Sequence, residues 1–196
     1  MNGGYSRQQL RAERRALSTA EQQLAGNKLT SNLCRESLFT DAERLALYLA
    51  NDGEIDPAAL LNRALESGKK CFLPVLHPTE PSTLCFVGYD VDSPMVPNKF
   101  GILEPVFDIG RVAPASTLDV ILMPLVGFDR LGNRLGMGGG YYDRTLAFMR
   151  EQHSGNPKLI GLAHSCQEVE LICQQSWDIP LHLIATDREI ICVKQR

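Results

Sequence analysis

The 196-residue sequence lacks long apolar runs, closely spaced cysteine pairs and an excess of positive charge. No apolar run approaches the roughly 18 residues that would span a membrane, and the N-terminal stretch is polar, without a signal-peptide core. None of the six cysteines forms a C-x-x-C pair, and a chain of this size with 44% hydrophobic residues can build a core without disulfides. We therefore expect reduced, buried thiols in a cytoplasmic protein that has no membrane partner.

Positive charge is scarce overall but is gathered in one segment. The 20 lysines and arginines are outnumbered by 23 aspartates and glutamates, and a net charge of −3 argues against a nucleic-acid-binding protein. The first 20 residues are the exception, because they hold four arginines and a single acidic residue: Arg7, Arg11, Arg14 and Arg15 against Glu13. An RNA-binding basic helix is an alternative that this segment leaves open.

Short apolar runs of strand length alternate with segments of helical pattern. We expect helices over 6–17, 18–39, 56–68 and 141–150, and strands over 44–50, 70–76, 83–89, 118–126, 158–163, 182–185 and 189–193. Residues 90–114 are rich in Pro, Gly and Asp, so irregular structure is expected there. The alternation predicts an α/β fold with a mostly parallel sheet, in a single domain over 1–196.

The run from Leu118 to Val126 is apolar nearly throughout, as expected for a parallel strand that is buried on both faces. Ligands of open parallel sheets bind beyond the carboxyl ends of the strands. The loop after Val126 lies at such an end, and so does the turn after Ala50 that leads to Glu54. These two loops will share one cleft if their strands are neighbours in the sheet.

Glycine is concentrated where that strong strand ends. Six glycines fall within the fourteen residues from Gly127 to Gly140, between an apolar strand and a helical segment. Glycine lets the backbone adopt positive φ and approach a ligand closely, and free N–H groups at the start of a helix attract phosphate. The segment contains neither the G-x-x-x-x-G-K-[ST] of a P-loop nor the third glycine of G-x-G-x-x-G. A flexible turn is therefore the simpler alternative.

Two polar features favour a phosphate site over that flexible turn. Arg134 offers a planar fork suited to phosphate oxygens. Asp143 follows the aromatic pair Tyr141-Tyr142, where its carboxylate would be able to hold Mg²⁺ beside phosphates.

The four histidines show no metal-ligand spacing and no G-x-S-x-G serine accompanies them, so we expect them to be structural or surface residues.

The glycine segment resembles that of the 5-formyltetrahydrofolate cyclo-ligases, also called 5,10-methenyltetrahydrofolate synthetases. The resemblance is carried by Gly127-Phe128-Asp129-Arg130-x-Gly132-Asn133-Arg134-Leu135-Gly136-x-Gly138-x-Gly140-Tyr141-Tyr142-Asp143. It extends in order to weaker pieces along nearly the whole chain: Arg7-x-x-x-Arg11, Gly53-Glu54-Ile55-Asp56, Leu73-Pro74 and Phe100-Gly101-Ile102-x-Glu104-Pro105. The resemblance implies a three-layer α/β/α sandwich with a mostly parallel central sheet.

The resemblance also implies a reaction. Family members use Mg-ATP to convert 5-formyltetrahydrofolate to 5,10-methenyltetrahydrofolate, with release of ADP and phosphate, through a phosphorylated formyl oxygen. Such chemistry needs phosphates and formyl oxygen held in line, with no protein nucleophile. On this resemblance the expected partners are the folate and ATP, the expected cofactor is Mg²⁺, and the protein is expected to be a monomer without nucleic-acid partners.

Residue roles follow from the resemblance position by position. Arg134 and Tyr142 are implied as catalytic groups, and Asp143 and Asp187 as metal ligands. Folate is implied to contact Glu54, Phe100, Met137 and Tyr141. The residues implied to bind ATP are Arg7, Arg11, Arg134, Leu135, Gly136, Met137, Gly138, Gly139, Gly140, Tyr141 and Tyr142.

The chain departs from some relatives at Met137 and Gly139, where those relatives carry basic residues. The loss of these two positive charges would weaken the affinity for ATP and the contact with the glutamate tail of the folate. A non-catalytic protein that binds folate or nucleotide as a regulator is the alternative function, with the two neutral positions as marks of lost turnover.

Overall fold

The computed structural model describes residues 5–150, 155, 157–175 and 177–193. The helices are α1 Arg7–Ala16, α2 Thr19–Leu33, α3 Ser37–Thr40, α4 Ala58–Glu66 and α5 Tyr141–Thr145. Short 3₁₀ turns are η1 Ile109–Arg111, η2 Ala115–Thr117, η3 Ala147–Arg150 and η4 Ser165–Gln167. The strands are β1 Arg44–Ala46, β2 Lys70–Leu76, β3 Leu84–Tyr89, β4 Met95–Pro97, β5 Leu103–Pro105, β6 Val112–Ala113, β7 Val120–Pro124, β8 Gly127–Phe128, β9 Arg134–Leu135, β10 Lys158–Leu162, β11 Leu183–Ala185 and β12 Ile190–Cys192.

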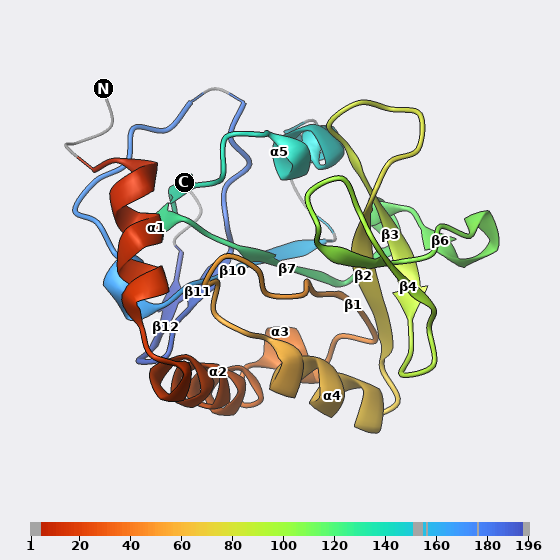
Figure 1. Ribbon diagram of the computed structural model, residues 1–196, viewed down its shortest axis with the longest axis horizontal. Coiled ribbons are helices and arrows are strands. Elements are labelled where there is room, and N and C mark those ends of the chain that lie inside the picture. Colours follow the sequence, from red (N-terminus) through yellow and green to blue (C-terminus); the bar gives the residue numbers. More distant parts are fainter. Residues whose placement is uncertain (1–4, 151–154, 156, 176, 194–196) are drawn as a thin grey trace.

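An eight-stranded sheet in the order β12-β11-β10-β7-β1-β2-β3-β6 forms the centre of the fold. The neighbours from β11 to β2 run parallel, and the pairs toward both edges are antiparallel. Helices α2, α3 and α4 cover one face and α5 lies on the other, so the molecule has three layers (Figure 1). The predicted α/β fold with a mostly parallel central sheet is confirmed.

Strand β7 shows why the sheet is apolar on both faces. Val120 and Leu122 pack into the core beneath α2 and α4, whereas Ile121 and Met123 pack into the core on the side of α5. Successive side chains of a strand point to opposite faces, so a strand covered on both sides is apolar without interruption. The prediction of a buried parallel strand in this run is confirmed.

Local signals fixed several helix ends. Ser18 and Glu21 form the capping box expected at the start of α2, and Gly68 ends the segment of α4 with φ +73°. The predicted helix over 18–39 is wrong in its length, because α2 ends at Leu33 and α3 follows after a turn. The predicted irregular segment 90–114 also contains the antiparallel hairpin β4–β5 and strand β6.

The expectation of buried thiols holds for only some of the cysteines. Cys71 and Cys85 lie in the core, where burial raises the pKa of both thiols, that of Cys71 to about 11. Cys166, Cys173 and Cys192 are exposed. Cys166 lies in the 3₁₀ turn η4, Cys173 in a loop and Cys192 on the edge strand β12.

Candidate active site

Helix α1 lies across the carboxyl ends of the parallel strands. Its Arg14 is fully buried and donates from Nη1 to the carbonyl oxygen of Leu125, just beyond β7, at 3.0 Å. The same guanidinium donates from Nε to the Asp52 carbonyl at 2.9 Å, in the turn beyond β1. Strands β1 and β7 are neighbours, so the condition for the two loops to share one cleft is met.

Asp52 collects most of the positive charge of α1. Arg11 donates to its carboxylate at 2.7 Å and Arg14 at 3.0 Å, and Arg15 binds it as well. Burial favours the neutral acid, but the three arginine hydrogen bonds outweigh burial and lower the pKa of Asp52 to about 2. The basic face of α1 is thus directed largely at the protein itself, which removes the main support for an RNA-binding helix.

The glycine segment begins as a small hairpin formed by β8 and β9. The buried carboxylate of Asp129 organises its turn, accepting hydrogen bonds from the N–H groups of Leu131 and Asn133, both at 3.0 Å, and from the amide of Asn133 at 2.8 Å. Gly132 completes this turn with φ +87°. A turn fixed by these hydrogen bonds limits the positions that the following residues, 136–140, can take.

Residues 136–140 present their backbone toward open space. Their N–H groups donate to no acceptor in the part of the chain that the structure describes. Two arginines hold the loop through its carbonyls: Arg7 donates to Gly136 at 2.8 Å and Arg144 donates to Gly139 at 2.5 Å. Gly138 and Gly140 have φ of +93° and +66°, which side chains disfavour. The loop therefore offers unpaired donors on a conformation that glycine permits.

Helix α5 is shorter than predicted. The expected helix over 141–150 ends at Thr145 and continues as the 3₁₀ turn η3. The Thr145 hydroxyl donates to the Tyr141 carbonyl at 2.8 Å and accepts from Leu84 N–H at 2.9 Å, tying the end of the helix to β3. So short a helix has a weak dipole, and attraction for an anion at this place rests on the loop amides and the arginines.

Arg134 and Asp143, implied as a catalytic group and a metal ligand, are paired with each other. Arg134 Nη2 lies 2.5 Å from Asp143 Oδ1, and its Nη1 also donates to the carbonyl of Ile179. The Arg134 side chain is only 8% exposed, against 27% for Asp143. Burial lowers the pKa of Arg134 and the charge of Asp143 opposes that shift. The pair leaves Asp143 Oδ2 without a partner among the described residues.

Glu54 and Tyr142 share this buried electrostatic environment. The Glu54 side chain is 12% exposed, accepts the Asn51 N–H at 3.1 Å and lies 3.6 Å from Arg14. Burial raises the pKa of Glu54 to about 7, although the charge of Arg14 opposes the shift. Burial likewise raises the pKa of Tyr142, and the charge of Glu54 adds to that rise while Arg134 opposes it. Glu54 thus lies close enough to Tyr142, in the helix that follows the glycine loop, for its charge to act on that side chain.

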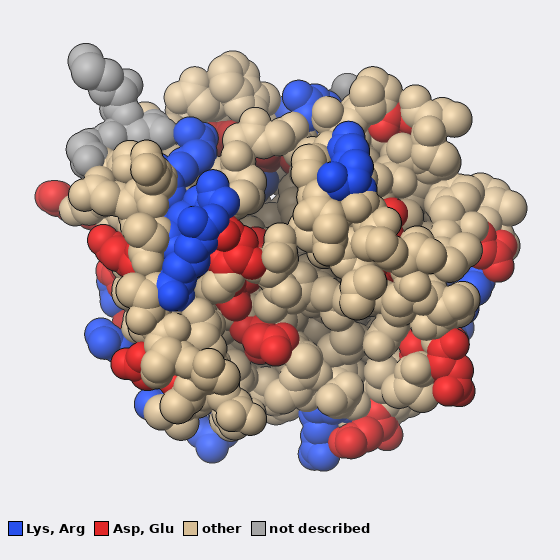
Figure 2. All heavy atoms as spheres, in the orientation of Figure 1, with Lys and Arg blue, Asp and Glu red and all other residues tan. Residues whose placement is uncertain are grey.

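The hairpin β4–β5 approaches the site from the side opposite helix α1 (Figure 1). Its Phe100 meets Tyr141 edge-to-face, with ring centroids 6.1 Å apart, so these two predicted folate contacts lie together. Figure 2 shows a hollow between α1, whose basic side chains form a blue stripe, and a second basic patch over the loop joining β4 and β5. Phe100 is 56% exposed and is therefore free to contact a bound molecule.

Asp187 lies beyond β11 and is held by η4. Its carboxylate accepts the N–H of Ser165 at 2.7 Å and the hydroxyl of Ser165 at 3.2 Å. Over the described ranges, no three His, Cys, Asp or Glu side chains gather closely enough to hold a metal by themselves. Any Mg²⁺ here would need phosphate oxygens among its ligands, which is how Mg²⁺ is usually held in ATP-using enzymes. The open oxygen of Asp143 fits that arrangement better than Asp187 does.

Three residues close to the site, Asp52, Arg14 and Lys99, have no site role predicted from the sequence. Arg14 is expected only as part of the basic segment. Asp52 is one of three acidic residues between 52 and 56, and the sequence does not distinguish it from Glu54 and Asp56 as the partner of the arginines in α1. His164 is buried as expected of a structural histidine, and burial lowers its pKa.

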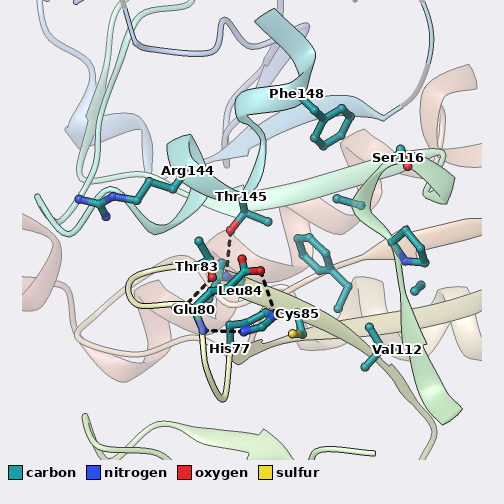
Figure 3. A pocket seen from close by; sticks show the side chains of 14 residues that line it. His77, Glu80, Thr83, Leu84, Cys85, Val112, Ser116, Arg144, Thr145 and Phe148 are labelled. Atoms are coloured by element: carbon teal, nitrogen blue, oxygen red, sulfur yellow. Dashed lines mark hydrogen bonds and ion pairs between the residues drawn. The ribbon is translucent and has the colours of Figure 1, made fainter. Parts of the chain in front are cut away.

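A separate pocket of about 360 Å³ lies where β3 and β6 meet α5 and η3 (Figure 3). Its walls include Phe86, Phe148 and Thr145, and Figure 3 shows Thr145 bonded across to Leu84. None of the residues implied to bind ATP, folate or metal is among those lining it. It is therefore distinct from the hollow beside the glycine loop.

The chain matches the family model of the 5-formyltetrahydrofolate cyclo-ligase family over residues 4–187. It is 40% identical over 181 residues to the 5-formyltetrahydrofolate cyclo-ligase of Escherichia coli (strain K12), covering 92% of this chain and 98% of that one. With the enzyme of the same name from Haemophilus influenzae it shares 42% identity over 181 residues, 89% of this chain and 94% of that one.

Its structure is also similar to solved ones. The NMR structure of Aquifex aeolicus 5,10-methenyltetrahydrofolate synthetase superposes with a TM-score of 0.79 at 30% identity, over 97% of this chain and 92% of that chain. A 5,10-methenyltetrahydrofolate synthetase from Mycoplasma pneumoniae superposes with a TM-score of 0.69 at 25% identity, over 93% of this chain and 96% of that chain.

Among the residues that the structure describes, no helix has the length and apolar character needed to cross a bilayer.

Proposed function

The chain belongs to the 5-formyltetrahydrofolate cyclo-ligase family and is an enzyme of that kind, and on this premise we propose that it uses Mg-ATP to phosphorylate the formyl oxygen of its substrate at the glycine loop. The observation that carries the proposal is the meeting of two loops at one edge of the sheet. One brings the unpaired amides of residues 136–140 with Arg134 and Asp143, and the other brings Glu54.

The phosphates of ATP are assigned to the side of the loop that faces α1. Successive backbone N–H groups that have no acceptor within the protein form a concave site in which they can donate to an anion. Arg7 already reaches the loop through Gly136, and its remaining guanidinium nitrogens are available for phosphate oxygens. Arg11 is engaged with Asp52, so we propose that it supports the phosphate site through its positive charge and need not leave Asp52.

The proposed reaction has two steps. The formyl oxygen attacks the γ-phosphorus, the new O–P bond forms, and the bond to the bridging oxygen breaks as ADP leaves with the electron pair. The anilino nitrogen then attacks the formyl carbon and loses its proton. The C–O bond breaks, and the oxygen departs with the phosphate as the ring closes. Arg134 is the buried cation that would neutralise charge developing on the transferred phosphoryl group.

Magnesium is assigned to the open Oδ2 of Asp143 together with phosphate oxygens. When bound, Mg²⁺ would supply charge neutralisation at the phosphates. Asp187 remains a second proposed ligand, although both of its oxygens bind Ser165 here. Tyr142 is proposed to border the reacting atoms with its hydroxyl protonated, because burial and the charge of Glu54 both raise its pKa.

The folate is assigned to the side of the loop that faces β4 and β5. Phe100 and Tyr141 offer two ring surfaces at right angles, which suit the flat pterin and benzoyl groups. The carboxylate of Glu54 is proposed to accept hydrogen bonds from pterin N–H groups. Met137 is half exposed on the loop itself and would contribute apolar contact to the same molecule.

Turnover tests the proposal directly. Purified protein with 5-formyltetrahydrofolate is expected to form the methenyl product, followed by its near-ultraviolet absorbance, only when Mg²⁺ and ATP are both present, with one ADP released per product. No product at micromolar enzyme over hours would overturn it. Folate binding in calorimetry without ADP release would instead support the non-catalytic regulator.

A pH dependence is expected from Glu54. Its ionised form is the one proposed to bind the pterin, and its pKa is raised to about 7. Therefore kcat/KM for the folate should rise as pH increases through about 7, and this rise should be absent from Glu54→Gln, which cannot ionise. Steady-state rates at saturating Mg-ATP from pH 5.5 to 8.5 measure it. Parallel profiles for both proteins would show that Glu54 is not the group responsible.

A further inference from the structure

The loop joining β4 and β5 is built to hold one lysine in place. Asn98 accepts hydrogen bonds from the N–H groups of Phe100 at 2.9 Å and Ile102 at 3.2 Å. The Asn98 amide donates to Glu104 at 3.0 Å, and Glu104 accepts the Leu76 N–H of β2 at 3.2 Å. The loop is thereby fastened to the central sheet, with Lys99 between two anchored residues.

The ammonium of Lys99 lies beside both aromatic rings of the proposed folate site. Its Nζ is 5.2 Å from the ring centroid of Phe100 and 5.9 Å from that of Tyr141. Both distances lie within the range of cation–π attraction, which holds the cation without neutralising it. In the described part of the chain Lys99 makes no ion pair, unlike Arg11, Arg14 and Arg134. It is an uncompensated charge next to the site.

We propose that Lys99 binds a carboxylate of the substrate's glutamate tail and so favours folates that carry glutamate. The inference rests on the proposed function, because it places the benzoyl ring against Phe100 and Tyr141. The glutamate is joined to the benzoyl ring by a single amide. A ring packed on these two aromatic residues therefore leaves the glutamate carboxylates close to an ammonium 5–6 Å from them.

The position of Lys99 suits a carboxylate ligand better than a phosphate ligand. The cations that reach the loop itself are arginines, with Arg7 at Gly136 and Arg144 at Gly139, and the planar fork of arginine suits phosphate. Lys99 instead stands apart on the aromatic side, carried by a different hairpin. The two neutral residues Met137 and Gly139 leave that side without another charged group from the glycine loop itself.

The test compares two substrates that differ only in the tail: 5-formyltetrahydrofolate and its analogue without glutamate, 5-formyltetrahydropteroate. Lys99→Met keeps an apolar stem and removes the charge. We expect the ratio of kcat/KM for the two substrates to fall about fivefold in Lys99→Met, mainly through KM, as fits one partly exposed charge pair. Lys99→Arg should restore most of the ratio, and Lys28→Met, on the exposed side of α2, should leave it unchanged.

Two results would overturn the inference. An unchanged substrate ratio in Lys99→Met would show that the ammonium does not recognise the tail. A raised KM for ATP with an unchanged ratio would assign Lys99 to phosphate. Wild-type protein without turnover would count against the proposed function alone, and the ratio of dissociation constants of the two folates, measured by calorimetry on the same variants, would then decide the inference.

Discussion

Replacing Arg134 with alanine is expected to lower kcat by a factor of about 100 to 1,000, the usual effect of removing one charge-stabilising donor from an active site. Arg134 is nearly buried and is fixed by Asp143 and the Ile179 carbonyl. A cation held in this way needs no reorganisation when charge develops on the phosphoryl group. Arg134→Lys should recover only part of the rate, because a lysine cannot bind Asp143 and a phosphate through one planar fork.

Arg130→Ala provides the matched control for Arg134. It lies on the same hairpin turn, but it is exposed and pairs with Glu168 and Glu189 outside the site. Its kcat should stay within twofold of the wild type. The thermal unfolding midpoint of each variant shows whether a loss of activity comes from the missing side chain or from an unfolded protein. A folded Arg134→Ala protein with a wild-type kcat would refute the assignment of this residue to the transferred phosphoryl group.

Replacing Arg14 with alanine is expected to lower the free energy of unfolding by about 3 kcal/mol, as is typical when one partner of a buried ion pair is removed. Arg14 is fully buried, and its loss leaves the carbonyl of Asp52 without that donor and leaves Glu54 without its nearest cation. The carbonyl of Leu125 keeps a second donor, Gln167, at 2.7 Å. Urea unfolding curves with equal slopes would give the difference from the shift in midpoint.

Arg15→Ala is the control for Arg14, because Arg15 binds the same carboxylate from an exposed position. Exposed pairs contribute about 0 to 1 kcal/mol, so this variant should unfold close to the wild type. Equal destabilisation by Arg14→Ala and Arg15→Ala would show that the buried hydrogen bonds of Arg14 add nothing beyond an exposed ion pair.

The pKa of Asp52 is lowered to about 2 from 3.8, so its contribution to stability is complete above pH 3.8 and is lost as pH falls toward 2.

The parts of the fold that follow from local pattern were predictable from the sequence. The uninterrupted apolar run of β7 indicated a strand covered on both faces, and the capping box at Ser18 indicated the start of α2. The placement of Glu54 near the glycine loop followed from the rule that parallel strands present their carboxyl ends at one edge. That prediction depended on β1 and β7 being neighbours, which they are.

The parts that depend on distant contacts were not predictable in the same way. The pairing of Arg11 and Arg14 with Asp52 joins residues 41 and 38 positions apart, and the local sequence does not show which of the acidic residues 52, 54 and 56 the arginines bind. Helix α5 ends at Thr145, whose hydroxyl accepts a hydrogen bond from Leu84 of β3, 61 positions away. The hairpin that carries Lys99 was hidden in a segment whose Pro and Gly content favoured irregular structure.

In the proposed reaction the formyl oxygen of the folate attacks ATP at the glycine loop. Turnover of 5-formyltetrahydrofolate labelled with ¹⁸O in the formyl group, followed by mass spectrometry of the released phosphate, tests it most directly. The mechanism predicts one ¹⁸O atom in each phosphate, because the oxygen that becomes bonded to phosphorus leaves with it. Unlabelled phosphate, with the ¹⁸O recovered in water, would contradict the account.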